Sequence, residues 1–325
     1  MPKGSVLFSS RAPIGYVAIA DNPVCTNQGF KSIIPNESIS SEFLYYQLKY
    51  LKKTIQDMGS GTTFKEISAK KFSTIKIIVP SLPEQERIVA QIEELFSQLD
   101  AGVETLKKTK AQLAVYRQAV LKEAFAELTE KKPIREMSSL VTSGSRGWAQ
   151  YYAGSGARFI RITDLTRDGI RLKNDSIQYV ELPDKAEGKR SRLLGGDVLV
   201  SITADLGSIA LIPENIDEAY INQHISMIRF NNPSQGEFMA WYLRSERGQK
   251  GLLKNKRGGG KLGLGLDDIR NTSVPIVSDE TARQTVSFID DRLSVCDNIK
   301  QTVDTALQQA EAMRQSILKA AFEGR

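Results

Sequence analysis

Apolar residues recur every seven positions in two long, otherwise polar stretches of the chain. In the first stretch, at 84–127, the repeating line is Ile92, Leu99, Leu106, Leu113 and Val120, and Ile88 and Leu95 form a second line. In the second stretch, at 280–322, the matching line is Ile289, Cys296, Val303, Ala310 and Ile317, flanked by Val286, Leu293 and Leu307. Heptad repeats predict two long helices whose apolar seams pack together as a coiled coil. The smaller residues of the second seam suit a close antiparallel pair.

The segments before each predicted helix have a different pattern. They are rich in Gly, Ser, Thr and β-branched residues, and short apolar runs between turn residues predict strands at 159–162, 197–202 and 208–212. Further strands are expected directly before the long helices, at 74–79 and around 272–277. Short helices with one apolar face are expected at 41–53 and 236–248. The predicted fold class is therefore α+β, with globular domains alternating with long helices.

The order of these elements occurs twice along the chain. Similar sequences recur in the same order at 4–9 and 196–201, at Asn27-Gln28 and Asn222-Gln223, and at 117–125 and 314–322. A repeat of this length indicates two homologous units, each made of a globular domain and a helix. The stretch 133–195 has no counterpart before Met1, so we expect the first globular domain to be incomplete.

The expected division has four parts. These are a partial first domain, a first helix, a complete second domain and a second helix, at 1–80, 81–130, 131–279 and 280–325.

Composition fits a soluble two-domain protein. The 325 residues are 41% hydrophobic and 25% charged, without a run of about 18 apolar residues or an N-terminal signal peptide. Only Cys25 and Cys296 could form a disulfide, so the reducing cytoplasm is the expected location and no membrane partner is expected. The formal net charge of +6 permits a polyanionic partner but does not prove one.

Three segments and one further residue of the second domain are of types suited to DNA. The basic stretch 244–261 contains Lys254, Lys256, Arg257 and Lys261 near several glycines, which allow close approach to phosphates. Another segment offers side chains that can read or pack on bases, namely Arg146, Trp148, Gln150 and Tyr151. Arg190 and Arg192 suit backbone contacts, and Thr203 follows a predicted strand, where it can face a groove. A solvated helix end, a core position for Trp148 and a turn role for Thr203 remain open alternatives.

Catalytic patterns are missing from the sequence. His224 is the only histidine, which excludes zinc sites built on histidine pairs and leaves a Ser-His-Asp triad strained. Neither Ser nor Thr follows Lys261, so 258–262 does not form a phosphate-binding loop. We expect no catalytic residues, no metal site and no cofactor in this chain.

Several sequence segments, taken in their duplicated order, resemble one known family. They are LFSSRAPIG at 7–15, LPEQERIV at 82–89, FIRITDL at 159–165 and GDVL at 196–199. In this order the chain resembles the specificity (S) subunit of type I DNA restriction–modification enzymes. The resemblance implies two target-recognition domains that each read half of a split site in double-stranded DNA.

The resemblance also implies protein partners. The two helices would act as a spacer and bind methyltransferase (M) subunits, and a motor-nuclease (R) subunit would join through the complex. S-adenosylmethionine, ATP and Mg would then be used by those partners, and a second S chain could complete the first domain. Two alternatives stay open: a truncated remnant or silent cassette, and a coiled-coil interaction protein without DNA specificity of its own.

Overall fold

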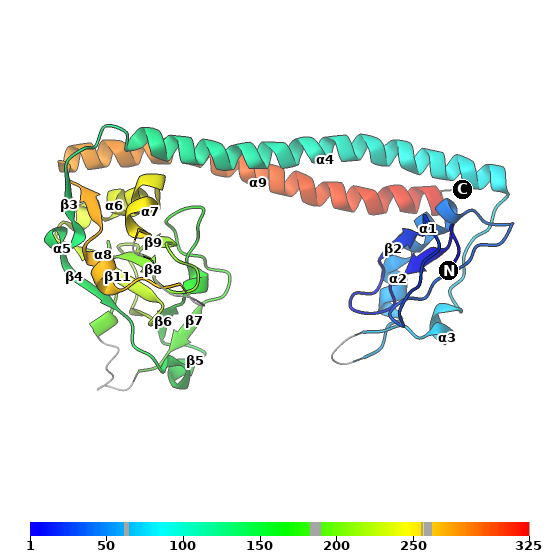
Figure 1. The fold of residues 1–325 in the computed structure, drawn as a ribbon, viewed down its shortest axis with the longest axis horizontal. Helices are drawn as coiled ribbons and strands as arrows, with labels where there is room; N and C mark the ends of the chain where they lie inside the picture. The colour runs from blue at the N-terminus through cyan, green and yellow to red at the C-terminus, as the bar shows by residue number, and fades with distance from the viewer. Residues whose placement is uncertain (62–64, 183–189, 255, 257–261, 325) are drawn as a thin grey trace. The chain divides into compact units, whose positions relative to one another are not determined.

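The structure is a computed structural model, and it describes residues 1–61, 65–182, 190–254, 256 and 262–324 (Figure 1). It divides into two compact units. Unit 1 consists of Met1–Ala111 and Lys300–Arg325, and unit 2 consists of Gln112–Ile299. Both long helices, α4 (Leu82–Ala124) and α9 (Asp279–Glu323), contribute one part to each unit. None of the described helices is long and apolar enough to cross a membrane.

Unit 1 has a small α+β core. Strands β1 (Val6–Phe8) and β2 (Val17–Ile19) form an antiparallel pair, followed by the helices α1 (Ser41–Tyr50), α2 (Lys52–Asp57) and α3 (Ala69–Phe72). The Ser40 hydroxyl caps the start of α1 by accepting a hydrogen bond from the N–H of Phe43. The side chain of Phe43 lies in the core. The core also takes side chains from both long helices, among them Ile88, Ile92, Phe96, Leu318 and Phe322.

The described residues of unit 2 form two four-stranded sheets, with strand orders β4-β11-β8-β9 and β10-β6-β7-β5, and a separate β12-β3 pair. All pairs are antiparallel except β10 with β6. The strands are β3 (Lys131–Pro133), β4 (Ser138–Ser143), β5 (Tyr152–Ala153), β6 (Ala157–Ile160), β7 (Gln178–Val180), β8 (Val198–Ser201), β9 (Ile209–Leu211), β10 (Ala219–Ile221), β11 (Ile225–Phe230) and β12 (Ser273–Pro275).

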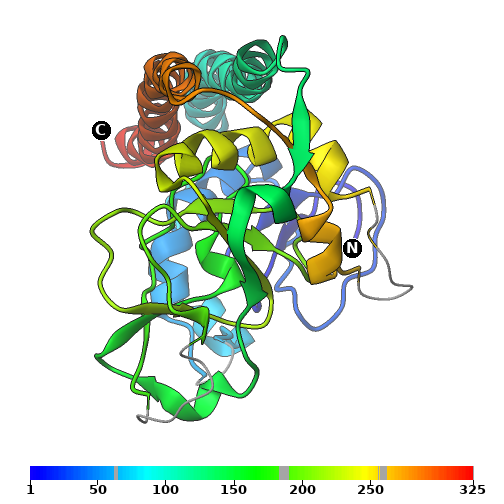
Figure 2. The same ribbon diagram turned by 90° about the vertical axis from the view of Figure 1, so that its left-hand side faces the viewer.

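Short helices connect these strands to the long helices. They are α5 (Ile134–Met137), α6 (Gly236–Arg244), α7 (Glu246–Leu252) and α8 (Leu266–Arg270), with 3-10 turns η1 (Trp148–Tyr151), η2 (Ile162–Asp164) and η4 (Pro233–Gln235). Within unit 2, α6 lies between the strands and the parts of α4 and α9 that belong to this unit (Figure 1 and Figure 2). The ring of Phe125, from the end of α4, contacts Phe238 and Tyr242 of α6 at centroid distances of 5.5 and 5.4 Å. This aromatic cluster fixes α4 to the sheet domain.

The long helices run antiparallel within each unit. In unit 1, Asp100 pairs with Arg314 and Lys110 with Asp304. Moving forward along α4 therefore means moving backward along α9. Unit 2 has the same arrangement, in which Arg117 pairs with Asp297 and Glu123 with Arg292. The pairs Asp100–Arg314 and Arg117–Asp297 join equivalent residues of the repeat in reversed roles. The predicted α+β class with an antiparallel helix pair is confirmed.

Apart from Leu95, the expected seam positions are all at least partly buried. Buried members are Ile92, Val120, Ile289, Leu293, Cys296, Val303 and Ala310, whereas Leu99, Leu106, Leu113, Leu307 and Ile317 are half-buried. The second line of α4 was misplaced, because Leu95 is 38% exposed and Phe96 is buried instead. Leu95 follows Ile92 by three residues and Phe96 follows it by four. The four-residue step places the Phe96 ring under the guanidinium of Arg314.

The duplication is visible in hydrogen bonds that recur atom for atom. After β1, the hydroxyl of Ser9 accepts a hydrogen bond from the N–H of Tyr16, and after β8 Ser201 accepts one from Ser208. Both loops place an alanine in the left-handed region, Ala12 with φ 42° and Ala204 with φ 61°. The two loops therefore share this hydrogen bond and a left-handed alanine at the equivalent place.

One predicted strand of unit 1 is wrong. Residues 74–79 form no strand, although the equivalent segment of unit 2, β12, pairs with β3. The reason is the absence of a partner, since no described residue of unit 1 corresponds to β3. A short apolar segment becomes a strand only when another strand accepts its hydrogen bonds.

Asp290 of α9 is expected to lower the stability of unit 2 at neutral pH. Its burial raises the pKa of the carboxyl group; Arg171 opposes this shift, and Asp291 adds to it. The folded state then keeps a proton that the unfolded state has lost, so this group's contribution to stability falls as pH rises from about 3.9 through the folded pKa. Asp290→Asn should raise the unfolding free energy of unit 2 at pH 7 by up to about 1 kcal/mol.

Urea unfolding at pH 7 and near pH 4 checks this expectation, and the gain should shrink at the lower pH. Asp217→Asn is the control, because it removes the same charge from an exposed position of unit 2 outside α9. An equal gain in both variants would attribute the effect to net charge rather than to the burial of Asp290.

Candidate nucleic-acid interface

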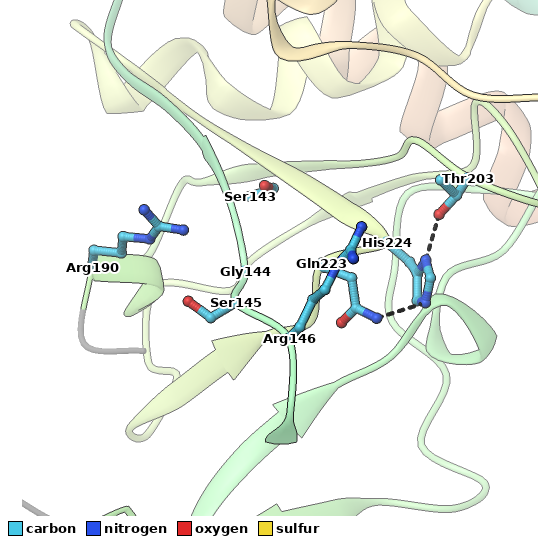
Figure 3. A pocket seen from close by; sticks show the side chains of 8 residues that line it. All are labelled: Ser143, Gly144, Ser145, Arg146, Arg190, Thr203, Gln223 and His224. Carbon is cyan, nitrogen blue, oxygen red and sulfur yellow. Dashed lines mark hydrogen bonds between the residues drawn. The ribbon is translucent and has the colours of Figure 1, made fainter. Parts of the chain in front are cut away.

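A polar hollow of about 700 Å³ lies on unit 2. Its lining comes mainly from the end of β4 and the following segment, from the loop after β8 and from the turn before β11. These segments are far apart in the sequence. The lining residues are Ser143, Gly144, Ser145, Arg146, Arg190, Thr203, Gln223 and His224 (Figure 3). We call this the polar hollow.

The segment after β4 passes very close to the end of β10. A Cβ atom on Gly144 would lie 1.9 Å from the carbonyl oxygen of Ile221, so only glycine fits there. The close crossing brings the exposed Arg146 beside the turn that carries Gln223 and His224, as Figure 3 shows. Arg190 lines the same hollow from another segment. The described residues that line the hollow include two guanidinium groups and no carboxylate.

Thr203 is held by the tight loop that follows β8. The backbone of Ser201 exchanges hydrogen bonds with Ser208 and Gly207, and Asp205 accepts hydrogen bonds from Arg167 and from the Ser208 hydroxyl. The hydrogen bond from Arg167 lowers the pKa of the Asp205 carboxyl, so this carboxylate is charged at neutral pH. The loop is therefore pinned at its base while Thr203 faces the hollow.

A hydrogen-bonded chain joins the imidazole to two neighbouring side chains. Gln223 Nε2 lies 3.0 Å from His224 Nε2, and Thr203 Oγ1 lies 2.6 Å from His224 Nδ1. Because an amide nitrogen donates, Nε2 of His224 accepts and its Nδ1–H donates to Thr203. In this arrangement the Thr203 hydroxyl hydrogen and the Gln223 amide oxygen are left to bind other groups.

In the turn before β11, Asn222 and Gln223 have different roles. Asn222 has the turn role, since its Oδ1 accepts the N–H of His224, as Asn27 Oδ1 accepts the N–H of Gly29 in unit 1. Gln223 instead lines the polar hollow. Neither Gln223 nor His224 was among the candidate DNA contacts. The sequence signal that could have found them is the repeated Asn-Gln pair before an apolar strand.

The prediction that Trp148 contacts DNA is wrong. Its side chain is only 5% exposed, and its ring lies 4.7 Å from Phe159 and 5.5 Å from Tyr220, so it belongs to the core rather than to an exposed base contact. Tyr151 packs against the same indole and is half-buried.

The other candidates are placed in different ways. Arg146, Arg190 and Thr203 come together in the polar hollow, whereas four exposed candidates are outside its lining, namely Gln150, Arg192, Lys254 and Lys256. Arg257 and Lys261 lie outside the described residues. Within the basic stretch, Arg247 binds the carbonyl oxygens of Phe125 and Ala126 at 2.6 and 3.0 Å and so caps α4.

The sequence matches the family described as "Type I restriction modification DNA specificity domain" over residues 1–114 and 149–309. The chain belongs to this family. The resemblance found in the sequence is therefore confirmed at the level of the family.

Individual relatives agree with this assignment. The chain is 43% identical over 109 residues to the type I restriction enzyme MjaIX specificity subunit of Methanocaldococcus jannaschii, a match that covers 33% of this chain and 24% of that protein. It is 23% identical to the EcoBI specificity subunit of Escherichia coli over 336 residues, covering 93% of this chain and 69% of that one. The chain thus spans about a quarter of the first relative and about two thirds of the second.

Solved structures show the same fold. A chain from a study of complex assembly and conformational transition of the type I R-M system covers all of this chain and 83% of its own length, with 21% identity and a TM-score of 0.78. The HsdS subunit of Thermoanaerobacter tengcongensis also covers this whole chain and 82% of its own length, with 20% identity and a TM-score of 0.50.

Proposed function

We propose that this chain gives a type I restriction–modification complex its DNA sequence specificity and that the polar hollow of unit 2 takes one half-site of double-stranded DNA. The observation that carries the proposal is the convergence of Arg146, Arg190, Thr203 and Gln223 on one open site, without an acidic side chain among its described lining residues. Such a site attracts phosphates and offers donors and acceptors to base edges.

The roles follow from side-chain chemistry. Arg146 can donate two hydrogen bonds to guanine, and Gln223, with its amide oxygen free, can pair with adenine. Arg190 and the exposed cations Arg192, Lys254 and Lys256 suit phosphate contacts that position the duplex. Gln150 and Tyr151, which are close to Arg146 in the sequence, would add further contacts, as would Arg257 and Lys261 of the basic stretch.

The proposed partners act through the helices. The seams hold α4 and α9 together as a spacer, and the faces that remain outside the seams would bind methyltransferase (M) subunits, with a motor-nuclease (R) subunit joining the complex. S-adenosylmethionine, ATP and Mg would be used by those subunits and not by this chain. In functional terms the recognition parts are 1–80 and 131–279, and the spacer parts are 81–130 and 280–325.

The decisive experiment is co-expression of this chain with a type I methyltransferase subunit, followed by mapping of methylated bases. We expect methylation at a defined sequence in which at least one half-site changes when the lining of the polar hollow is altered. Methylation that ignores those substitutions would place recognition elsewhere, and no methylation would favour a remnant or a coiled-coil interaction protein.

Salt dependence gives a second test. Arg190→Ala should weaken binding of the complex to target and unrelated DNA by a similar factor and reduce the slope of log affinity against log salt by about 1, because one phosphate contact is lost. Lys132→Ala, an exposed cation of β3 that does not line the hollow, is the control and should leave the slope unchanged. A selective loss of target binding in Arg190→Ala would instead assign Arg190 to base reading.

A further inference from the structure

Unit 2 contains a buried ion pair at a place where unit 1 has no charged side chain. The Asp197 side chain is only 1% exposed, and the guanidinium of Arg229 donates to both of its carboxylate oxygens, from Nε to Oδ1 at 2.8 Å and from Nη2 to Oδ2 at 2.7 Å. Asp197 directly precedes β8, and Arg229 lies near the end of β11. The pair therefore joins two neighbouring strands where β8 begins and β11 ends.

The same pair also holds the segment that leads into β8. Nη2 of Arg229 donates to the carbonyl oxygen of Arg192 at 3.1 Å, and Oδ2 of Asp197 accepts the N–H of Leu194 at 2.8 Å. Both hydrogen bonds end on backbone atoms shortly after Arg190, which lines the polar hollow. The ion pair is thus connected to the hollow through a few residues of main chain.

Alternating burial directs the cations of this segment outward. Ser191 and Leu193 are buried, whereas Arg190 and Arg192 are exposed. The N–H of Leu193 donates to the carbonyl oxygen of Ala219 at 2.9 Å, which ties the buried side of the segment to β10. A shift of this segment would therefore move the Arg190 guanidinium relative to the rest of the polar hollow.

Unit 1 shows that the shared fold does not require the pair. Ser5 stands at the place of Asp197, and the strand pairing puts Ile34 at the place of Arg229. The turn is nevertheless the same, because the N–H of Ser5 donates to the carbonyl of Pro2 at 3.2 Å, as the N–H of Asp197 does to the equivalent carbonyl of unit 2. Pro2 has no N–H that would need a carboxylate acceptor. What the pair adds in unit 2 is the attachment of the segment that carries the cations.

We propose that the Asp197–Arg229 ion pair positions Arg190 for its contact with DNA, so that Arg229 is a positioning residue rather than a DNA contact. This inference rests on the proposed function of the polar hollow. The planar guanidinium fixes the directions of its donors, and one group therefore sets both the carboxylate and the Arg192 carbonyl in place. The net stability from a buried ion pair is typically small, because desolvation offsets the attraction between the charges. The main effect of this pair is to fix the segment.

The residues of unit 1 supply the test. The double variant Asp197→Ser with Arg229→Ile introduces the residues that unit 1 has at these places and leaves the net charge unchanged. It also avoids the unpaired buried carboxylate that Arg229→Ile alone would leave. In the complex with a methyltransferase subunit, the slope of log affinity for DNA against log salt should fall by about 1, as in Arg190→Ala. Adding Arg190→Ala to the double variant should cost no more than about twofold in affinity, because both changes remove the same contact.

Hydrogen exchange measures the loosening of the segment itself. The amide of Leu193 should exchange at least about tenfold faster in the double variant, while the amides of β8 and β11 keep their protection. The N–H of Leu193 bonds to Ala219 and not to the ion pair, so its exchange rises only if the segment loosens. Phe125→Leu is the control for lost stability, because Phe125 packs against α6 and belongs to a different apolar cluster from Leu193. This control should leave the salt slope unchanged.

The possible failures are distinguishable. Unchanged exchange at Leu193, or affinity losses that add in the combined variant, would overturn this inference and leave the proposed function intact. Unfolding of unit 2 in the double variant would also overturn it, since the pair would then serve the fold itself. If Arg190→Ala leaves DNA binding and its salt slope unchanged, the proposed role of Arg190 in the polar hollow is wrong, and this inference is wrong with it.

Discussion

Arg146→Ala is expected to weaken binding of the complex to its target DNA by about 1–3 kcal/mol, or roughly 5- to 150-fold, while binding to unrelated DNA changes little. The close crossing at Gly144 presents Arg146 to the hollow beside Gln223 and His224. A guanidinium that donates two hydrogen bonds to one base carries sequence information, whereas a phosphate contact does not. Competition binding with target and scrambled duplexes at fixed salt measures the difference.

Two further variants sharpen this test. Gln223→Ala should also relax specificity, because it removes the amide from the hollow and the hydrogen bond that holds the His224 tautomer. Gln150→Ala changes an exposed neighbour that does not line the hollow and should have a smaller effect. If Arg146→Ala lowers affinity equally for all sequences, Arg146 is a phosphate contact and the reading residues lie elsewhere.

Phe125→Ala is expected to destabilise unit 2 by about 3–5 kcal/mol. The side chain is fully buried and makes edge contacts with Phe238 and Tyr242, so its removal leaves a cavity between α4 and α6. The repeat provides a matched variant in Phe322→Ala, whose ring occupies the equivalent place in unit 1 against Phe43 and Tyr50.

Hydrogen exchange resolved by segment distinguishes the two variants. Phe125→Ala should increase exchange in α6 and β8, and Phe322→Ala should increase it in α1 and β1 instead. Phe125→Leu should cost less, because it keeps most of the buried apolar volume. Equal loosening of both units by either variant would contradict the independent cores described for units 1 and 2.

Most of the fold could be predicted from two features of the sequence, the heptad spacing and the duplication. The lines through Ile92 and Ile289 place both helices because burial on a helix recurs with a fixed period whatever the partner is. The step from Ile92 to Phe96 rather than Leu95 was not predictable, because both spacings fit a helical seam. The partner's side chains, here Arg314 over the Phe96 ring, select between them.

The site was only partly predictable. Arg146, Arg190 and Thr203 were chosen for their residue types, and folding brings them together from three segments. Trp148 was misassigned because an indole suits a core and a DNA contact equally well by composition. Its neighbours Phe159 and Tyr220, distant in sequence, determine its burial. Gln223 and His224 were missed because the segments that meet them in the hollow are likewise distant in sequence.

The sequence by itself determined the repeat, the two long helices, the α+β class and the family, because each depends on local periodicity or on the order of similar segments. Only the tertiary structure decided which polar side chains meet and which apolar segments find a strand partner. Residues 74–79 and Ser273–Pro275 have similar patterns, yet only the latter is a strand, because β3 accepts its hydrogen bonds. A strand is a property of two segments, so one segment's sequence cannot determine it.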